Sequence, residues 1–178
     1  KKIVDKKLLI ITELCDNGDL FDYMRRTPKP QFSQLISADN RAKINDFGLA
    51  RIRPRMNTIV HTACGTPNWQ APEFWTSHPS YTEKVDVYAC GLIFWEILQW
   101  GAEPYPYHDM TEHQLYSKGK FSLLCIYPFR DEEYRPPLAK LQKYPSELLD
   151  LIQEMWAQEP RNRPPMTQVV ERLLDYLS

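Results

Sequence analysis

The chain has 178 residues with 22 basic and 23 acidic side chains, so its formal net charge is -1. This balance creates no strong field toward nucleic acid or an anionic membrane, and it excludes proteins that select such partners by net charge. With 43% hydrophobic residues, the chain can build one domain around a single core. The longest apolar run, 87–100, contains Glu96 and is shorter than the roughly 20 residues of a membrane span, which predicts a core helix.

The cysteines indicate the compartment. None of the four lies in a C-x-x-C pair, and the chain shows no secretory signal. We therefore expect reduced thiols in a cytoplasmic protein.

The first 45 residues predict strands and one short helix. Residues 3–4 and 8–12 are β-rich runs separated by a polar turn, which favours a hairpin. Asn17-Gly18 ends the second run, and 19–26 follows as a short helix with Asp19 available as its N-cap. The runs 34–37 and 42–45 flank a turn and predict a second small hairpin.

The remainder of the chain is a long loop followed by helices. Residues 46–72 show no periodicity, and loops of that length are uncommon unless they are functional. Ser80 with Glu83 fits a capping box, with Thr82 as a rival cap, for a helix to about Trp100. Further helices are expected from Thr111, Ser146 and Thr167. Two of them predict buried faces, made of Leu148, Leu149, Ile152, Met155 and Trp156 and of Val170, Leu173, Leu174 and Leu177.

One tripeptide carries candidate chemistry. Asp46 stands at the end of a predicted strand, where one carboxylate is aimed at a fixed point and can bind a hard divalent cation. Gly48 lets the backbone turn sharply behind it. The tripeptide alone is a weak signal, but "GTPNWQAPE" at 65–73 follows it, and the pair together is specific.

Five stretches in order resemble a protein kinase. They are the hinge-like 8–24, "DFGLAR" at 46–51, "GTPNWQAPE" at 65–73, "DVYACGLIFWEI" at 86–97 and "EPRNRPP" at 159–165. The combination is most similar to the tyrosine-kinase-like branch of serine/threonine kinases.

The resemblance implies an α+β, protein-kinase-like fold made mostly of the helical C-terminal lobe. Residues 1–18 would be a strand remnant of the small lobe with the hinge. Residues 19–178 would be the helical large lobe, with the activation segment at 46–73.

The resemblance also implies ATP and Mg²⁺ as cofactors. Asp46 would ligate the magnesium that bridges the ATP phosphates. The Glu13 carbonyl and the Cys15 amide would bond the adenine edge. Asp19 would lie near the ribose, although a helix cap alone explains this residue equally well.

A protein substrate is the implied partner, and Thr66 would line the pocket for the residue after the phosphoacceptor. Glu73 and Arg163 would form a buried ion pair beneath the activation segment, unless each is simply a surface charge. Thr58 and Thr62 would be phosphorylation sites, since arginines nearby can bind a phosphate; alternatively they are ordinary loop threonines.

The catalytic loop of the family, His-Arg-Asp-x-Lys-x-x-x-Asn, is missing. At the spacing from Asp46 that the family uses, its aspartate, lysine and asparagine fall on Pro28, Pro30 and Ser33, so no catalytic residue is present. A helix that precedes this loop is absent too, roughly 35 residues in all by comparison with the family. Residues 119–130, in contrast, stand where the family has a short connection, as an intron read through or a natural surface insertion.

Two function classes follow. The first is an incompletely represented serine/threonine kinase whose chain is inactive as it stands. The second is a pseudokinase that acts as a scaffold or binding module. Because a pseudokinase usually keeps its helices, the loss of a whole helix favours the first.

Overall fold

The computed structural model describes residues 15–30, 42–44, 49–50, 65–75, 80–111, 113–115 and 135–176. This part of the chain is mostly helical and contains no strand. The first predicted hairpin lies outside the described residues, and of the second only 42–44 is described, without strand structure.

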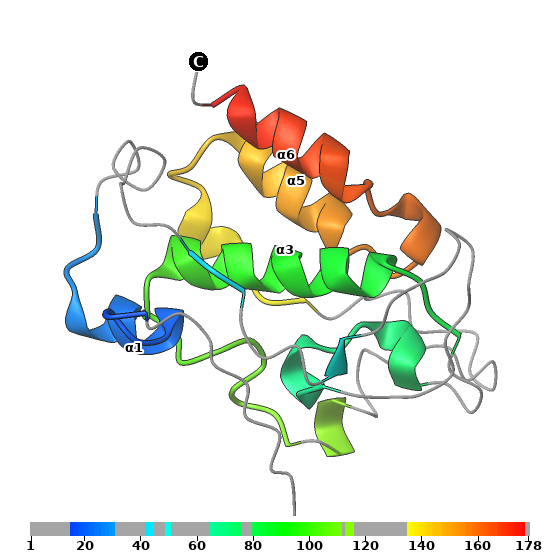
Figure 1. Ribbon diagram of the computed structural model, residues 1–178, viewed down its shortest axis with the longest axis horizontal. Coiled ribbons are helices and arrows are strands. Elements are labelled where there is room, and N and C mark those ends of the chain that lie inside the picture. Colours follow the sequence, from blue (N-terminus) through cyan, green and yellow to red (C-terminus); the bar gives the residue numbers. More distant parts are fainter. Residues whose placement is uncertain are drawn as a thin grey trace, which may run out of the picture.

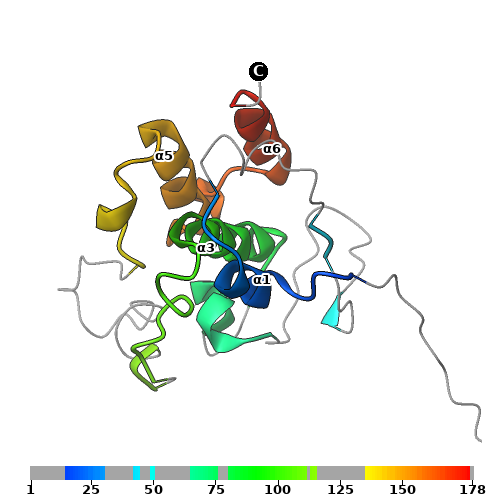
Figure 2. The same ribbon diagram turned by 90° about the vertical axis from the view of Figure 1, so that its left-hand side faces the viewer.

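The centre of the fold is helix α3, Lys84–Gln99. Helix α5, Ser146–Met155, lies along it, and α6, Met166–Leu174, packs against both helices, above α5 in the view of Figure 1 and beside it in Figure 2. Short 3₁₀ turns complete the described elements: η2 (Pro67–Trp69), η3 (Pro72–Trp75), η4 (Ala139–Leu141) and η5 (Pro160–Asn162). The helical arrangement agrees with the large lobe of a kinase.

The start of α3 differs from the predicted capping box. The helix begins at Lys84, and Thr82 Oγ1 accepts a hydrogen bond from the Lys84 amide at 3.3 Å. The predicted capping box on Ser80 is therefore wrong. The alternative cap, Thr82, supplies the side-chain hydrogen bond at the start of the helix. The helix ends at Gln99, one residue before the predicted Trp100, which adopts a left-handed conformation as its C-cap.

Gly91 brings α3 and α5 close together. A Cβ placed on Gly91 would lie 3.0 Å from the Cβ of Met155 and 3.6 Å from the Ile152 carbonyl oxygen. The 3.0 Å contact is tighter than nine in ten real Cβ contacts, so any larger residue at position 91 would require Met155 to shift by a few tenths of an ångström.

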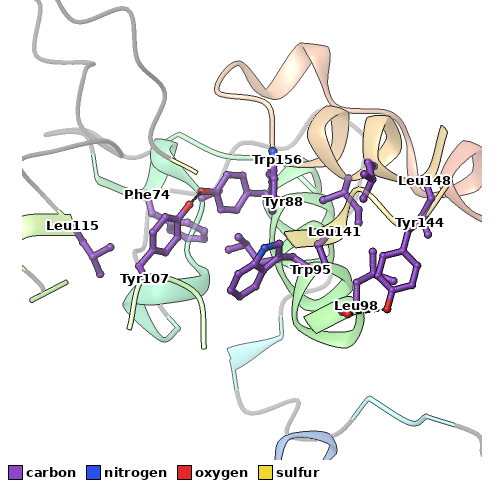
Figure 3. Packing of buried hydrophobic residues seen from close by; sticks show 14 of the residues in the cluster. Phe74, Tyr88, Trp95, Leu98, Tyr107, Leu115, Leu141, Tyr144, Leu148 and Trp156 are labelled. Atoms are coloured by element: carbon purple, nitrogen blue, oxygen red, sulfur yellow. Dashed lines mark hydrogen bonds between the residues drawn. The ribbon is translucent and has the colours of Figure 1, made fainter. Parts of the chain in front are cut away.

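The main core is rich in aromatic residues (Figure 3). Trp95 of α3 is 2% exposed, and its indole N–H donates to the Pro137 carbonyl at 3.1 Å. The Tyr88 hydroxyl lies 3.2 Å from that of Tyr107, and the Tyr144 hydroxyl donates to the Leu98 carbonyl at 3.0 Å. The large side chains therefore bury their rings while their polar atoms remain hydrogen-bonded.

The predicted face of α5 is confirmed, because Leu148, Leu149, Ile152, Met155 and Trp156 are all buried.

The predicted face of α6 is wrong at two of its three described residues, and its fourth residue, Leu177, lies outside the described part of the chain. Val170 and Leu174 are 48% and 54% exposed, while Val169 is buried and packs with Val87, Leu151 and Met155. Leu173 also contacts this cluster. The core-facing residues Val169 and Leu173 are four apart and share one helix face, which lies next to the predicted one.

Helix α1, Leu20–Arg26, is short and lies at the C-terminal end of α3 (Figure 2). Asp19 Oδ1 accepts from the Asp22 amide at 2.8 Å, so the predicted N-cap is confirmed. The Trp100 indole N–H donates to the Thr27 carbonyl at 3.0 Å, and the ring meets that of Tyr23 edge-on. These contacts of Trp100 attach α1 to the helical core.

Candidate functional site

The segment 65–69 presents the predicted pocket residue Thr66. Thr66 is exposed and precedes η2, where Pro67 occupies the first turn and the Trp69 amide donates to the Thr66 carbonyl at 3.1 Å. Proline is suited to this position because its fixed φ matches the turn and its missing N–H is not needed there. The turn therefore holds Thr66 at the surface.

Trp69 anchors this turn to the central helix. Its indole N–H donates to Glu96 Oε2 at 2.8 Å. Burial raises the pKa of the Glu96 carboxyl above its usual value, and the hydrogen bond from Trp69 opposes part of that rise. Glu96 is the one charged residue in the apolar run 87–100, and the structure gives it a partner.

Asn68 anchors the same turn on its other side. Its side-chain amide donates to the Pro106 carbonyl at 2.8 Å. Pro106 and Tyr107 are buried, whereas Tyr105 remains 38% exposed and its ring centroid lies 6.1 Å from that of Trp69. The turn 65–69 and the loop 101–110 thus form one connected surface.

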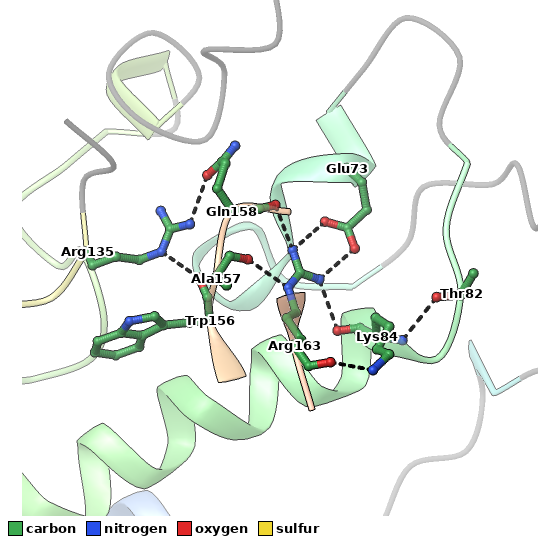
Figure 4. Close-up of polar contacts among 8 residues, drawn as sticks. All are labelled: Glu73, Thr82, Lys84, Arg135, Trp156, Ala157, Gln158 and Arg163. Atoms are coloured by element: carbon green, nitrogen blue, oxygen red, sulfur yellow. Dashed lines mark hydrogen bonds and ion pairs between the residues drawn. The ribbon is translucent and has the colours of Figure 1, made fainter. Parts of the chain in front are cut away.

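Glu73 and Arg163 are brought together beside the start of α3 (Figure 4). The Arg163 guanidinium donates to both carboxylate oxygens of Glu73, at 2.7 and 2.9 Å. Arg163 is 1% exposed and Glu73 is 7% exposed. The pair is therefore bidentate and buried, the geometry in which arginine binds a carboxylate most strongly.

The remaining donors of Arg163 are also used. They bond the carbonyls of Ala157 at 2.8 Å, Lys84 at 3.0 Å and Gln158 at 3.2 Å, and the Lys84 ammonium in turn donates to the Arg163 carbonyl. A buried guanidinium is stable only when its N–H groups are hydrogen-bonded in this way. The network joins η3, the start of α3 and the turn before α6.

Tyr88 lies against two guanidinium groups. The Arg163 group lies 5.0 Å from the ring centroid and the Arg135 group 5.4 Å. Arg135 also donates to the Trp156 carbonyl and to Gln158 Oε1, both at 2.8 Å. The cation–π contacts and these bonds hold residues 135 and 163 on one side of α3.

The segment after α1 is described as far as Pro30, and residues 27–30 include no acidic side chain. Pro28 and Pro30 have no regular structure, and Ser33 lies outside the described residues. The Lys29 ammonium donates to the Leu98 carbonyl, and burial lowers its pKa. This segment therefore rests on the end of α3.

Half of the residues predicted for the nucleotide site lie within the described part of the chain. Glu13 and Asp46 lie outside the described residues, as do Thr58 and Thr62. Cys15 is exposed, with its carbonyl accepting from the Gly18 amide at 3.0 Å.

The structure describes the surroundings of two further acidic residues, Asp19 and Asp86. Asp19 is exposed and caps α1, while its contact with a ribose stays a prediction. Asp86, in the first turn of α3, has its pKa raised by partial burial and by the charge of Glu83.

The described residues contain no group of three or more histidine, cysteine or acidic side chains that could hold a metal ion. Within the same ranges, no helix combines the length and the apolar character that crossing a membrane requires.

Comparison with known proteins identifies the family. The family model of the protein kinase domain matches residues 29–174. The chain belongs to the protein kinase family. The dual specificity protein kinase shkD of Dictyostelium discoideum is 36% identical over 143 residues, which cover 80% of this chain and 17% of that protein. The mitogen-activated protein kinase kinase kinase dlk-1 of Caenorhabditis elegans is 31% identical over 135 residues, 76% of this chain and 13% of its own length.

A third relative differs from this kinase chain in length. It is a probable serine/threonine-protein kinase of Dictyostelium discoideum, 27% identical over 218 residues that cover 94% of this chain and 22% of the relative. At least 40 of those positions have no residue here (218 - 178). The chain thus spans less than a quarter of the length of each of these relatives.

Sequence reasoning missed the anchors of the 65–69 turn. The bond from Trp69 to Glu96 joins residues 27 apart, and that from Asn68 to Pro106 joins residues 38 apart. The sequence did contain a sign of the bond from Trp69 to Glu96, because Glu96 is a single carboxylate inside an apolar run and needs a hydrogen-bonding partner. Nothing local marks the second.

Proposed function

We propose that this chain is the protein-substrate-binding lobe of a cytoplasmic serine/threonine kinase of the tyrosine-kinase-like branch, and that it transfers no phosphate as it stands. In this proposal residues 1–18 are the small-lobe remnant and hinge, and 19–178 are the large lobe. The observation that carries it is the buried pair of Glu73 and Arg163, which ties the end of the segment 46–73 to the helical core.

Thr66 supports a substrate-binding role. It is exposed, and it stands on a turn anchored at Trp69 and Asn68. A peptide binds best to a surface that is already ordered, because less conformational entropy is lost on binding. We infer that the residue after the phosphoacceptor binds beside Thr66.

The inactivity of the chain follows from its missing groups. The position of the catalytic aspartate holds Pro28, and a proline side chain cannot accept a proton. The relative with at least 40 additional aligned positions supports the loss of an internal stretch (218 - 178). In the whole kinase, ATP and Mg²⁺ would bind at Glu13, Cys15, Asp19 and Asp46.

The test compares the chain with a chimera. The chain should give no incorporation from radiolabelled ATP into a serine peptide library, since a positioned base is worth roughly 10²- to 10⁴-fold. A chimera that receives the small lobe and the catalytic loop of the dual specificity protein kinase shkD should phosphorylate the library. The matched control is the same chimera with Asp46→Asn, which keeps the side-chain size and removes one carboxylate charge.

Two results would contradict the proposal. Robust transfer by the 178-residue chain would overturn its inactivity. A folded chimera that binds peptide without phosphorylating it would favour the scaffold function instead.

Thr58 and Thr62 are proposed as the regulatory sites of the whole kinase. A phosphate there can order the segment through charge-assisted bonds to Arg51, Arg53 or Arg55. Replacing both threonines with alanine in the active chimera should prevent activation by an upstream kinase. Unchanged activation would exclude this control.

A further inference from the structure

Two lysines share one aromatic ring at the C-terminal end of α3. The Lys29 ammonium lies 5.3 Å from the ring centroid of Tyr144, and the Lys143 ammonium lies 5.5 Å from the same point. Tyr144 is 8% exposed, and its hydroxyl donates to the Leu98 carbonyl, which fixes the ring (Figure 3). Two positive charges therefore lie beside one rigid side chain.

Neither lysine has an acidic partner among the described residues. The ion pairs in that part of the chain join other side chains. Lys140 shows the contrast, because it stands three residues before Lys143 and lies 2.7 Å from a carboxylate oxygen of Glu103. Two like charges beside one ring repel each other, and a bound anion would turn that repulsion into attraction.

A helix cap explains only one of the two lysines. The Lys29 ammonium donates to the Leu98 carbonyl in the last turn of α3, where the helix dipole favours a cation. An ammonium has three donors, so this bond leaves two of them for a ligand. The described contacts of Lys143 include no hydrogen bond to α3, so capping does not account for its place beside the ring.

We propose that Lys29 and Lys143 bind the phosphate of a phosphorylated protein segment. A phosphate monoester carries about -1.5 to -2 charges and three acceptor oxygens, which suits two ammonium groups better than a single carboxylate does. Lysine binds phosphate as a point charge on a flexible stem, so the exposed Lys143 can reach the same anion as Lys29. Pro28 and Pro30 restrict the backbone around Lys29, which reduces the entropy lost on binding.

A peptide suits this site better than a membrane does. Anionic lipid surfaces attract clusters of about four to eight basic residues, whereas this site has two lysines and the chain has a net charge of -1. In Figure 3 Tyr144 lies at the opposite end of the core from Tyr107, whose carbonyl accepts from the Asn68 amide. The site is thus separate from the surface proposed for the protein substrate, and the inference does not depend on phosphate transfer.

The experiment measures peptide binding to the 178-residue chain by fluorescence anisotropy. The probe is a rhodamine-labelled peptide with one phosphoserine, compared with the same peptide carrying serine or glutamate at that position. The variants are K29Q, K143Q and the double variant. The matched control is K140Q, which removes the same charge from an exposed lysine of η4. Thermal melts monitor the folding of each protein.

K29Q and K143Q should each weaken binding of the phosphoserine peptide by about 2- to 10-fold, the range for one net hydrogen bond. The double variant should bind this peptide no better than the serine peptide, and K140Q should bind it like the unaltered chain. Added salt should weaken the binding. Partial burial lowers the pKa of Lys29, and the phosphoserine peptide should raise it in an NMR titration, because an anion favours the ammonium form.

Three results would overturn the proposal. One is equal binding of the phosphoserine and serine peptides by the unaltered chain. Another is full phosphopeptide binding by the double variant, which would place the anion elsewhere. The third is binding of vesicles that contain phosphatidylinositol 4-phosphate without any binding of the phosphopeptide, which would make a membrane the partner. If K29Q does not fold, the comparison of K143Q with K140Q decides, because both lysines are exposed.

Discussion

The helices α1 and α5 show how unevenly this kinase chain is held together. Of the ten residues of α5, five are buried, whereas α1 buries only Met24 of its seven. Buried apolar area is the main source of stability, at about 25 cal/mol per Å². The region around α3 and α5 therefore carries the stability, while α1 is attached mainly through Trp100.

This difference in burial separates the surface proposed to bind the protein substrate from the segment that follows the proposed hinge. The surface assigned to the protein substrate is anchored to the rigid region through the bond from Trp69 to Glu96 of α3. The segment that follows the proposed hinge has a local helix cap and few buried contacts. Segments with few buried contacts open at lower free energy than the core of a protein.

The largest effect is expected at the buried ion pair. Arg163→Ala strands the Glu73 carboxylate, and removing one partner of such a pair costs about 3 to 5 kcal/mol of unfolding free energy. The matched control is Arg161→Ala, since Arg161 is exposed and lies 3.9 Å from Glu159; it should cost less than about 1 kcal/mol. Urea denaturation measures both. Equal losses would mean that the pair is not buried in solution.

The next effect concerns the crossing of α3 and α5. Gly91→Ala forces a Cβ against Met155, and overpacking of this kind costs about 1 to 3 kcal/mol. Combining it with Met155→Gly should cost less than the sum of the two single changes, because that change removes the Met155 Cβ against which the new Cβ packs. Full additivity in urea denaturation would contradict the close crossing.

A smaller and more local effect is expected at α1. Trp100→Phe removes the indole donor to the Thr27 carbonyl, a hydrogen bond worth about 0.5 to 1.5 kcal/mol net. Amide hydrogen exchange should accelerate in Leu20–Arg26 and stay unchanged in Ser146–Met155. Equal acceleration in both helices would show that they unfold as one unit.

The last effect is a pH dependence from Glu96. Its pKa in the folded protein is raised by burial, so on raising the pH the unfolded chain releases its proton first. The stabilising contribution is thus complete below the ordinary glutamate pKa, about 4.3, and is lost as the pH rises through the folded value. Glu96→Gln should remove this loss, making the variant relatively more stable at neutral pH than in acid.

The measurement is urea denaturation of Glu96→Gln and of the unaltered chain, from a pH below the ordinary glutamate pKa up to neutral pH. Glu171→Gln is the control, because the same change at an exposed residue should leave the pH dependence as it was. Asp86, whose pKa is raised as well, remains in all three proteins and contributes equally to each. A constant stability difference between Glu96→Gln and the unaltered chain would contradict the prediction.

Several features could be predicted because they depend on nearby residues or on motifs. The N-cap of Asp19 needs only the backbone three residues ahead, and the buried face of α5 follows from helical spacing. The contact of Glu73 with Arg163 joins residues 90 apart; only the kinase resemblance of the two motifs indicated it. The family itself followed from the order of such motifs.

The tertiary structure decided what local pattern could not. The exposed Val170 and the buried Val169 are neighbours of one type, and which of them faces the core depends on where α3 and α5 lie. The anchors of the turn, from Trp69 to Glu96 and from Asn68 to a backbone carbonyl, join distant segments. A backbone carbonyl carries no residue identity, so such a bond leaves no sequence pattern and exists only once the chain has folded.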